Sequence, residues 1–437
     1  MTDSTRDADI LILGGGIIGV TAAYDLTQAG RRVLLLDREF PGAGASQGNA
    51  GHFATEQIFP IADASLLWQV PKLLLDPLGP LAIDWRYAHR IAPWLMRFLW
   101  NMRPAQVRRT TEGLAALGSN SLAAWQQLLA ATGGESLIRS HESLTVFEQA
   151  RTGRKLERDM KQMQAYAVPV SLISGAEARE RVPALSEQVQ GALHFTATGH
   201  VADPLKVLEH VWTWASQAGA RFRQAEARGI ELSPEGVRVT TEQGELRADQ
   251  VLVACGAHSR PLVRQATGVN APLDTERGYH LMLPGERDRL PIAVASAERR
   301  FLMTPMEGGL RLAGTVEFAG LDRPANWQRA WMMRAHANRL LVAPLDEEGA
   351  RPWMGFRPTL PDCLPVIDRL GPGGRLLLAF GHHHLGLTQS AFTAQIITAL
   401  ANDAEPPISV EPYRLARFGK PRRKQNDNNA HRPQRLE

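Results

Sequence analysis

Apolar runs and glycine-rich turns alternate near the start of the chain, as in proteins with a buried parallel sheet. The run 10–13 (ILIL) has no polar residue in alternation, which predicts a strand buried on both faces. Apolar residues at helical spacing follow and stop at Gly30, and a second apolar run, 33–36, ends at Asp37. The pattern therefore predicts a strand, a turn, a helix and a second strand within residues 10–37.

The turn of this unit, 14–19 (GGGIIG), has the spacing of a dinucleotide-binding motif. Gly14 permits the tight turn, Gly16 lets a pyrophosphate approach the backbone, and Gly19 allows the helix to pack closely on the strand. The alternative is a glycine-rich turn in an α/β domain that binds no nucleotide. The strand before the turn and the helix after it favour the dinucleotide.

The residues that follow the turn favour FAD over NAD. Free N–H groups at the helix start, near Ile17 and Ile18, attract an anion, and Asp37 can bind ribose hydroxyls. A small polar loop, 42–52 (GAGASQGNAGH), comes directly after this acid. Such a loop is typical of the phosphate- and flavin-contacting segment of FAD enzymes, whereas NAD domains normally continue with a plain strand and helix. Taken alone, the loop could also be an ordinary surface loop.

Residues 376–402 contain no Asp, Glu, Lys or Arg, but they include three consecutive histidines, 382–384. We interpret the segment as a buried strand, a turn and a helix, and not as a membrane span. A metal site is disfavoured because neighbouring side chains point in different directions and no carboxylate cluster completes a ligand set. The sequence instead favours a turn whose helix start, 386–388, faces the anionic edge of a reduced flavin.

The segment 85–103 (WRYAHRIAPWLMRFLWNMR) alternates apolar and basic residues at helix-like spacing. Such a helix can lie on an anionic membrane. The alternative is a helix that packs its aromatic face on its own domain, which is the more common role of Trp and Leu at this spacing.

Composition limits the classes that this protein can belong to. Its 437 residues suggest roughly two to three domains, and 44% hydrophobic with 22% charged residues is ordinary for a globular protein. The formal charge of +4 equals that of the tail 420–437, so the body shows no signal for nucleic acid. Two cysteines exclude a disulfide framework, and the N-terminus lacks a secretory pattern, which together indicate the cytoplasm.

Several longer motifs resemble those of one enzyme family over about residues 9–415. They are SQGNAG (46–51), GHVADP (199–204), VACGAHS (253–259), RGYHL (277–281), LRLAGTVEFAG (310–320), GFRPTLPDCLPVID (355–368) and GHHHLGLT (381–388). The chain resembles the FAD-dependent D-amino-acid oxidase / glycine oxidase superfamily, and among its members the bacterial D-amino-acid dehydrogenases most. The last two motifs are the most specific.

The resemblance implies α/β and α+β structure, with a Rossmann-type FAD-binding domain interleaved with a mixed β-sheet substrate domain. The implied FAD domain comprises 1–84, 198–274 and 353–419, the substrate domain 85–197 and 275–352, and the basic tail 420–437 is expected to be disordered. The residues implied in FAD binding are Gly14, Gly16, Ile17, Ile18, Gly19, Asp37, Arg38, Ser46, Gln47, Asn49, Ala50, Gly51, Ala254, Gly256, Gly381, His384, Leu385, Gly386, Leu387 and Thr388.

The resemblance also implies a substrate site. Arg357 would hold the substrate carboxylate, since a guanidinium fork suits that group. Tyr279 and His280 would line the pocket, and His52 and His382 could bind a substrate hydroxyl. Relatives that supply another arginine near 303–308 differ from this chain, which has Met306 there.

The implied reaction is oxidation of a D-amino acid or a small secondary amino acid, such as a proline or hydroxyproline epimer. FAD would be non-covalent, because Gly355 stands where some relatives attach it to cysteine. The alternatives are an O₂-using oxidase of glycine- or sarcosine-type amines, a FAD-dependent 2-hydroxy-acid dehydrogenase and an NAD-dependent dehydrogenase. A further alternative is a nucleotide-binding or membrane-surface module that is not an enzyme. The sequence leaves the electron acceptor open between a quinone, another carrier and O₂. It also leaves open a peripheral location on the inner face of the cytoplasmic membrane.

Overall fold

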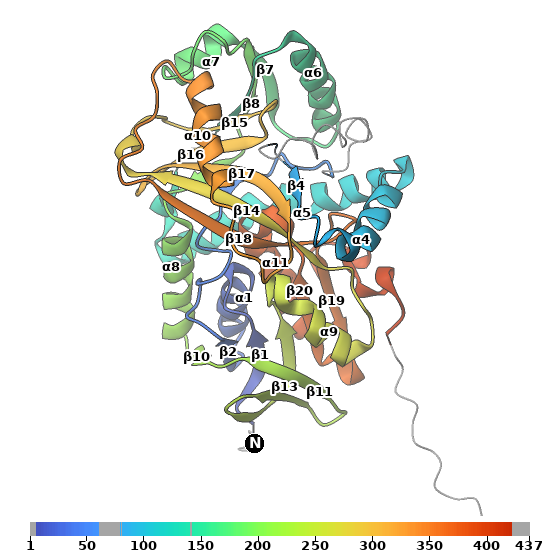
Figure 1. The fold of residues 1–437 in the computed structure, drawn as a ribbon. Coiled ribbons are helices and arrows are strands. Elements are labelled where there is room, and N and C mark those ends of the chain that lie inside the picture. The colour runs from blue at the N-terminus through green and yellow to red at the C-terminus, as the bar shows by residue number, and fades with distance from the viewer. Residues whose placement is uncertain (1–5, 61–78, 80, 140–141, 422–437) are drawn as a thin grey trace, which may run out of the picture.

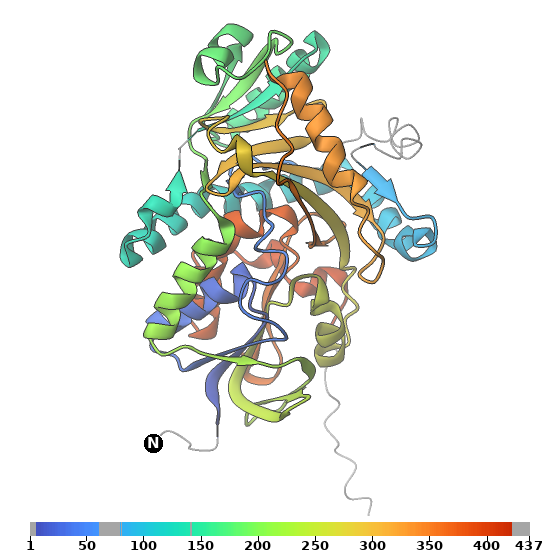
Figure 2. The ribbon, with the colours of Figure 1, turned by 60° about the vertical axis from the view of Figure 1, so that its left-hand side comes forward.

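The computed structural model describes residues 6–60, 79, 81–139 and 142–421. Strands within these residues form an eight-stranded, a nine-stranded and a three-stranded sheet. Both views place the nine-stranded sheet above the eight-stranded one, with helices packed on each (Figures 1 and 2). This is the mixed α/β architecture that the sequence predicts.

The eight-stranded sheet contains the predicted dinucleotide-binding unit. Its strands in spatial order are β10 (Arg221–Gln224), β2 (Val33–Asp37), β1 (Ala8–Leu13), β13 (Gly244–Val253), β12 (Val237–Thr241) and β11 (Ala227–Leu232), and β20 (Leu376–Phe380) with β19 (Val366–Leu370) extends from β13. Its helices are α1 (Ile17–Gln28), α5 (Pro104–Thr132), α8 (Pro204–Gln217), α9 (Ser259–Thr267) and α11 (Gly386–Ala401). Ile10 and Ile12 of β1 pack into one core, and Leu11 and Leu13 pack into another. Burial on both faces explains why this strand is apolar throughout.

In the eight-stranded sheet, β1 runs parallel to β2 and β13, and β13 runs parallel to β20. The nine-stranded sheet lies over the carboxyl ends of these strands (Figures 1 and 2). Its strands in spatial order are β18 (Arg351–Thr359), β14 (Asp274–Leu283), β17 (Gly309–Phe318), β16 (Phe301–Met306), β15 (Ala293–Ser296), β6 (Ser143–Phe147), β8 (Gly191–Phe195) and β7 (Val170–Ser174), and β4 (Leu81–Ile83) pairs with β17. Its helices are α6 (Ala150–Ala165), α7 (Gly175–Arg181) and α10 (Gln328–Leu340). The three long strands at one edge, β18, β14 and β17, are those that reach the cavity described below.

The remaining elements are short or peripheral. The third sheet consists of β3 (His52–Phe53), β9 (Gly199–Val201) and β5 (Ile138–Arg139), and α4 (Ala88–Asn101) lies at the periphery (Figure 1). Turns of 3₁₀ helix are η1 (Glu135–Leu137), η2 (Gly256–His258), η3 (Pro284–Glu286), η4 (Pro372–Gly374), η5 (His383–Leu385), η6 (Glu411–Tyr413) and η7 (Leu415–Phe418). Among the described helices, none has both the length and the apolar character needed to cross a bilayer.

Some segments pair or pack with a sheet other than that of their predicted domain, and two of them matter for the site. The segment 353–359, predicted in the FAD domain, is part of β18 and pairs with β14 in the nine-stranded sheet. Helix α5, predicted in the substrate domain, buries Trp125 in the core of the eight-stranded sheet, where the indole N–H donates to the Leu387 carbonyl at 2.8 Å. The helical periodicity of α5 predicts which of its faces is buried, but not the sheet on which that face packs. Within the predicted tail, residues 422–437 lie outside the described residues.

Candidate functional site

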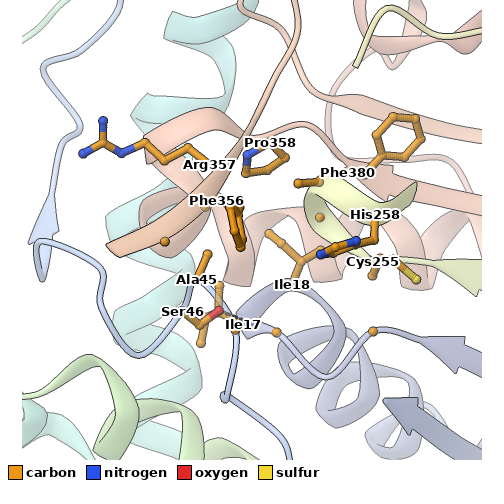
Figure 3. Close-up of a pocket in the computed structure, with 18 of the residues that line it drawn as sticks. Ile17, Ile18, Ala45, Ser46, Cys255, His258, Phe356, Arg357, Pro358 and Phe380 are labelled. Atoms are coloured by element: carbon orange, nitrogen blue, oxygen red, sulfur yellow. Dashed lines mark hydrogen bonds between the residues drawn. The ribbon is translucent and has the colours of Figure 1, made fainter. Parts of the chain in front are cut away.

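A cavity of about 680 Å³ lies between the two large sheets. Figure 3 shows Ile17, Ala45 and Ser46 on one side of it and Phe356 and Arg357 of β18 on the other. The predicted residues that line it are Gly14, Gly16, Ile17, Ile18, Asp37, Arg38, Ser46, Gln47, Asn49, Ala50, Ala254, Gly256, Tyr279, Arg357, Gly381, His382, His384, Gly386 and Leu387. Segments far apart in the sequence thus meet at one cavity.

The three motif glycines meet different neighbours. Gly14 has φ +110°, and a Cβ atom there would lie 2.4 Å from the Ala254 carbonyl oxygen. A Cβ atom on Gly19 would lie 1.9 Å from the Gly14 carbonyl oxygen. Gly16 differs, since a Cβ atom there would meet only the Ser46 hydroxyl, at 3.3 Å. Gly14 and Gly19 are therefore required by the fold, whereas Gly16 keeps the cavity side of the turn open.

The start of α1 offers an anion-binding site in the cavity. The N-cap residue is Gly16, so no N-cap side chain occupies the first N–H groups of the helix, and the first turn has no acidic residue. The Ile17 N–H donates to the Ser46 hydroxyl at 2.9 Å, which places a hydroxyl beside the positive end of the helix dipole. These residues fit a pyrophosphate.

The other end of the cavity fits a ribose. Asp37 ends β2, and its carboxylate accepts from the Gly15 N–H at 2.6 Å and from the Glu39 N–H at 3.1 Å. These two bonds fix the carboxylate at the cavity wall. Arg38 lies beside it, with Nη2 3.1 Å from the Nε2 atom of His258.

The flavin-type loop 46–51 is held by an arginine that the sequence analysis missed. Arg311 of β17 is only 6% exposed, and its guanidinium donates to the carbonyls of Asn49 and Gln47. Burial lowers the pKa of this guanidinium to about 10. A charged residue in the otherwise apolar segment 310–314 (LRLAG) is the only sequence signal for this contact.

Arg357 extends along the cavity face of β18. Its Nη1 and Nη2 atoms donate to the carbonyls of Thr315 at 3.0 Å and Gly314 at 3.3 Å, which use two of its five N–H donors. Thr315 has φ +55°, and β17 gains an extra residue against β14 at this point. This bulge presents both carbonyls to the guanidinium. Burial lowers the pKa of Arg357, and the Glu276 carboxylate opposes that shift.

The three consecutive histidines point to three different partners. The Nε2 atoms of His382 and His384 contact the Thr393 hydroxyl, at 3.2 Å, and the Gln57 side-chain oxygen. His383 faces Thr359. Burial lowers the pKa of His382 and of His384 to about 3, so both are neutral near pH 7. Among the described residues, no group of three or more His, Cys, Asp or Glu side chains could hold a metal ion.

His383 belongs to a buried hydrogen-bonded chain that the sequence analysis also missed. Its Nε2 atom accepts from the Leu360 N–H at 3.0 Å, so the proton is on Nδ1 and points to the Thr359 hydroxyl at 2.9 Å. Thr359 in turn donates to Glu276 at 2.9 Å. His383 has φ +53°, a conformation that a non-glycine residue rarely adopts. The chain ties the turn at 381–385 to the strand that carries Arg357.

The other predicted pocket residues have structural partners. Tyr279 touches the cavity, but its hydroxyl donates to the Glu317 carboxylate at 2.6 Å within the core of the nine-stranded sheet. His280 donates from Nδ1 to the Gly48 carbonyl at 3.0 Å. His52 lies outside the cavity lining, bonded to the Gly199 carbonyl at 3.0 Å and to Glu56 at 2.9 Å. The predicted FAD residues outside the lining are Gly19, Gly51, Leu385 and Thr388.

Neither cysteine is arranged as a nucleophile. The Cys255 thiol lines the cavity and donates to the Leu13 carbonyl at 3.1 Å, and burial raises its pKa to about 12. Cys363 is buried and does not line the cavity. Since the thiolate is the reactive form of cysteine, the Cys255 thiol is unreactive near neutral pH.

Comparison with known proteins matches the sequence of this chain to one family. The model of the DAO family, described as FAD dependent oxidoreductase, matches residues 9–400. A D-amino-acid oxidase of Bradyrhizobium diazoefficiens is 32% identical over 94% of this chain and 98% of its own length. A D-amino acid dehydrogenase of Cereibacter sphaeroides is 29% identical over 95% of this chain and 96% of its own length.

Two solved structures share the fold. Glycine oxidase from Geobacillus kaustophilus superposes with a TM-score of 0.72 at 21% identity, and covers 94% of this chain and 98% of its own. L-proline dehydrogenase from P. horikoshii superposes with a TM-score of 0.71 at 18% identity, with the same coverage. Because the family model and the relative from Bradyrhizobium diazoefficiens match nearly the whole chain, the chain belongs to the DAO family of FAD-dependent oxidoreductases.

Proposed function

We propose that the protein oxidises the amine of a small α-amino acid, either a D-amino acid or a small secondary amino acid such as a proline or hydroxyproline epimer. The observation that carries this proposal is the Arg357 guanidinium, which faces the cavity with N–H donors left for a carboxylate. The names of the relatives, D-amino-acid oxidase and D-amino acid dehydrogenase, support amine oxidation. When bound, FAD supplies a two-electron acceptor for the hydride of the substrate Cα–H.

The protein residues would contribute position and charge. Arg357 binds the carboxylate and thereby orients Cα, and the neutral amine reacts without an obligatory protein base. His280 and His384 stay neutral near the cavity, because burial lowers the pKa of each to about 3. They therefore add no positive charge that would repel an incipient iminium. The imine product hydrolyses to a 2-oxo acid, or persists if the substrate is cyclic.

Anaerobic reduction of the bound flavin by a panel of substrates tests the proposal. The panel comprises D- and L-amino acids, glycine, sarcosine, the proline and hydroxyproline epimers, and 2-hydroxy acids. We expect amino acids to bleach the absorbance near ~450 nm. Bleaching by glycine or sarcosine alone would indicate an oxidase of glycine- or sarcosine-type amines, and bleaching by hydroxy acids alone would overturn amine oxidation. Reoxidation by O₂ or by a soluble quinone then identifies the acceptor class.

We also propose that α4 contacts an anionic membrane surface, as electron transfer to a quinone in the membrane would require. One face of α4 packs inward through Ile91 and Trp94. The other exposes Met96 at 67% and Trp100 at 57%, and the Arg103 guanidinium lies 3.1 Å from the Trp100 ring centroid. Residues 85–103 contain four arginines and no acidic residue. Exposed apolar residues flanked by arginines are typical of interfacial helices.

Replacing both Met96 and Trp100 with aspartate is expected to abolish binding to vesicles that contain anionic lipid. The change removes apolar contact and adds negative charge to the face that would meet the lipid. Cosedimentation with anionic and with zwitterionic vesicles measures it, and deletion of 420–437 separates the contribution of the basic tail. Unchanged binding of the double variant would contradict the role of α4.

A further inference from the structure

Trp353 of β18 forms a wall of the cavity next to the arginine. Residues 353, 355 and 357 alternate along the strand and so share one face, and the cavity lining contains them together with residues 354, 356 and 358 of the other face. The Trp353 ring stacks on His280 with centroids 4.9 Å apart and planes 14° from parallel. A Cβ atom on Gly48 would lie 2.3 Å from three atoms of the Trp353 ring. The ring therefore lies directly against the backbone of the flavin-type loop.

Trp353 and Arg357 converge over one pair of glycines. Gly278 of β14 lies opposite Gly355 of β18 in the ladder. The Arg357 guanidinium covers Gly278, where an added Cβ atom would be 2.4 Å from Cζ. The edge of the Trp353 ring reaches Gly355, where an added Cβ atom would be 2.0 Å from Cη2. The guanidinium and the edge of the indole thus cover two directly paired glycines, so the two side chains lie side by side on one face of the sheet.

The indole is held by partners that are themselves fixed. His280 donates from Nδ1 to the Gly48 carbonyl at 3.0 Å, so the ring on which Trp353 stacks is tied to the same loop that the indole touches. Arg311 anchors the carbonyls on both sides of Gly48, those of Gln47 and Asn49. Moving the indole away would forfeit its stacking on His280 and its contact with Gly48. The wall is therefore preformed.

We propose that Trp353 sets the upper size limit of the substrate side chain. This inference rests on the proposed function, because a carboxylate bound by Arg357 brings the substrate Cα next to the neighbouring Trp353 ring. The substituent on Cα then meets the indole within a short distance. We therefore expect side chains of the size of alanine or the proline ring to be accepted beside the indole, and aromatic side chains to collide with it.

Replacing Trp353 with alanine is expected to shift the preference toward large side chains. The measured quantity is the second-order rate constant of anaerobic flavin reduction by alanine, proline, phenylalanine and tryptophan, each as both enantiomers. We expect the ratio of the phenylalanine to the alanine rate constant to rise at least ~10-fold, since small changes of pocket volume give about 10- to 200-fold discrimination. Trp353→Phe keeps an aromatic ring on His280 and should give a smaller rise. Trp331→Ala, at a 39% exposed position on α10, is the matched control and should leave the ratio unchanged.

The outcomes separate this inference from the proposed function. An unchanged ratio in both Trp353 variants, with normal reduction by alanine, would overturn the size limit and leave amine oxidation in place. Equal rates of the wild-type protein with tryptophan and with alanine would also overturn the size limit and leave amine oxidation in place. Failure of every amino acid with the wild-type protein would overturn both proposals. If the alanine variant does not fold, which flavin content and thermal unfolding report, the comparison rests on Trp353→Phe.

Discussion

Replacing Arg357 with methionine is expected to lower kcat/KM for the best amino-acid substrate about 100- to 1000-fold while FAD remains bound. The guanidinium lines the cavity next to β14 and can form two parallel bonds to a carboxylate. Truncating one partner of a buried, hydrogen-bonded charge pair costs about 3–4 kcal/mol, and this loss appears in kcat/KM. Steady-state kinetics with an artificial electron acceptor and the flavin absorbance of the purified variant measure the two quantities.

Two controls separate substrate binding from support of the fold. The methionine variant leaves the Gly314 and Thr315 carbonyls without their donor, so its free energy of unfolding should fall by about 1–3 kcal/mol. Arg357→Lys keeps the positive charge but loses the fork, and should recover only part of the activity. A methionine variant with normal kcat/KM would rule out the carboxylate-binding role. A variant that loses both flavin and activity would indicate a structural role instead.

A second large effect is expected from replacing the motif glycines Gly16 and Gly19, one of which should affect FAD binding and the other the stability of the fold. Gly16→Ala should weaken FAD binding at least ~100-fold while the free energy of unfolding of the apoprotein changes by no more than ~1 kcal/mol. The reason is that an added methyl group meets only the Ser46 hydroxyl, at 3.3 Å, and projects where the pyrophosphate must approach. Gly19→Ala should instead destabilise the fold itself, because its methyl group would overlap the Gly14 carbonyl oxygen.

Fluorescence titration of each apoprotein with FAD, together with its thermal unfolding, measures both effects. The matched pair is informative because the two variants add the same methyl group three residues apart. A Gly16→Ala protein that binds FAD within threefold of the wild-type affinity would show that the pyrophosphate does not approach this turn. Equal destabilisation by both substitutions would show that Gly16 is also required for packing.

The parts of the site that the sequence predicted are those that depend on local geometry. The turn 14–19, the strand that precedes it and Asp37 lie within one short unit, where spacing alone determines which groups meet. The histidines at 382–384 were expected to diverge because adjacent side chains point in different directions, and they do. Arg357 was placed through a motif resemblance, and the structure puts it at the cavity.

The parts that could not be predicted depend on which strands pair and in which register. Arg311 reaches the loop 46–51 only because β17 lies over it, about 260 residues away in sequence. Glu276 meets Thr359 because β14 and β18 are antiparallel neighbours. The alternation of β14 also turns the Tyr279 hydroxyl into the core and the neighbouring His280 ring toward Gly48. No single-sequence pattern specifies such pairings.

The most direct test of the account is to compare flavin reduction by an amino acid with reduction by the matching amine that lacks the carboxylate. The rates of anaerobic bleaching near ~450 nm are measured for the best amino-acid substrate and for its decarboxylated form at equal concentration. If Arg357 orients the substrate through its carboxylate, the amino acid should reduce the flavin at least ~100-fold faster. Equal rates for the two compounds, or reduction by neither, would contradict the account.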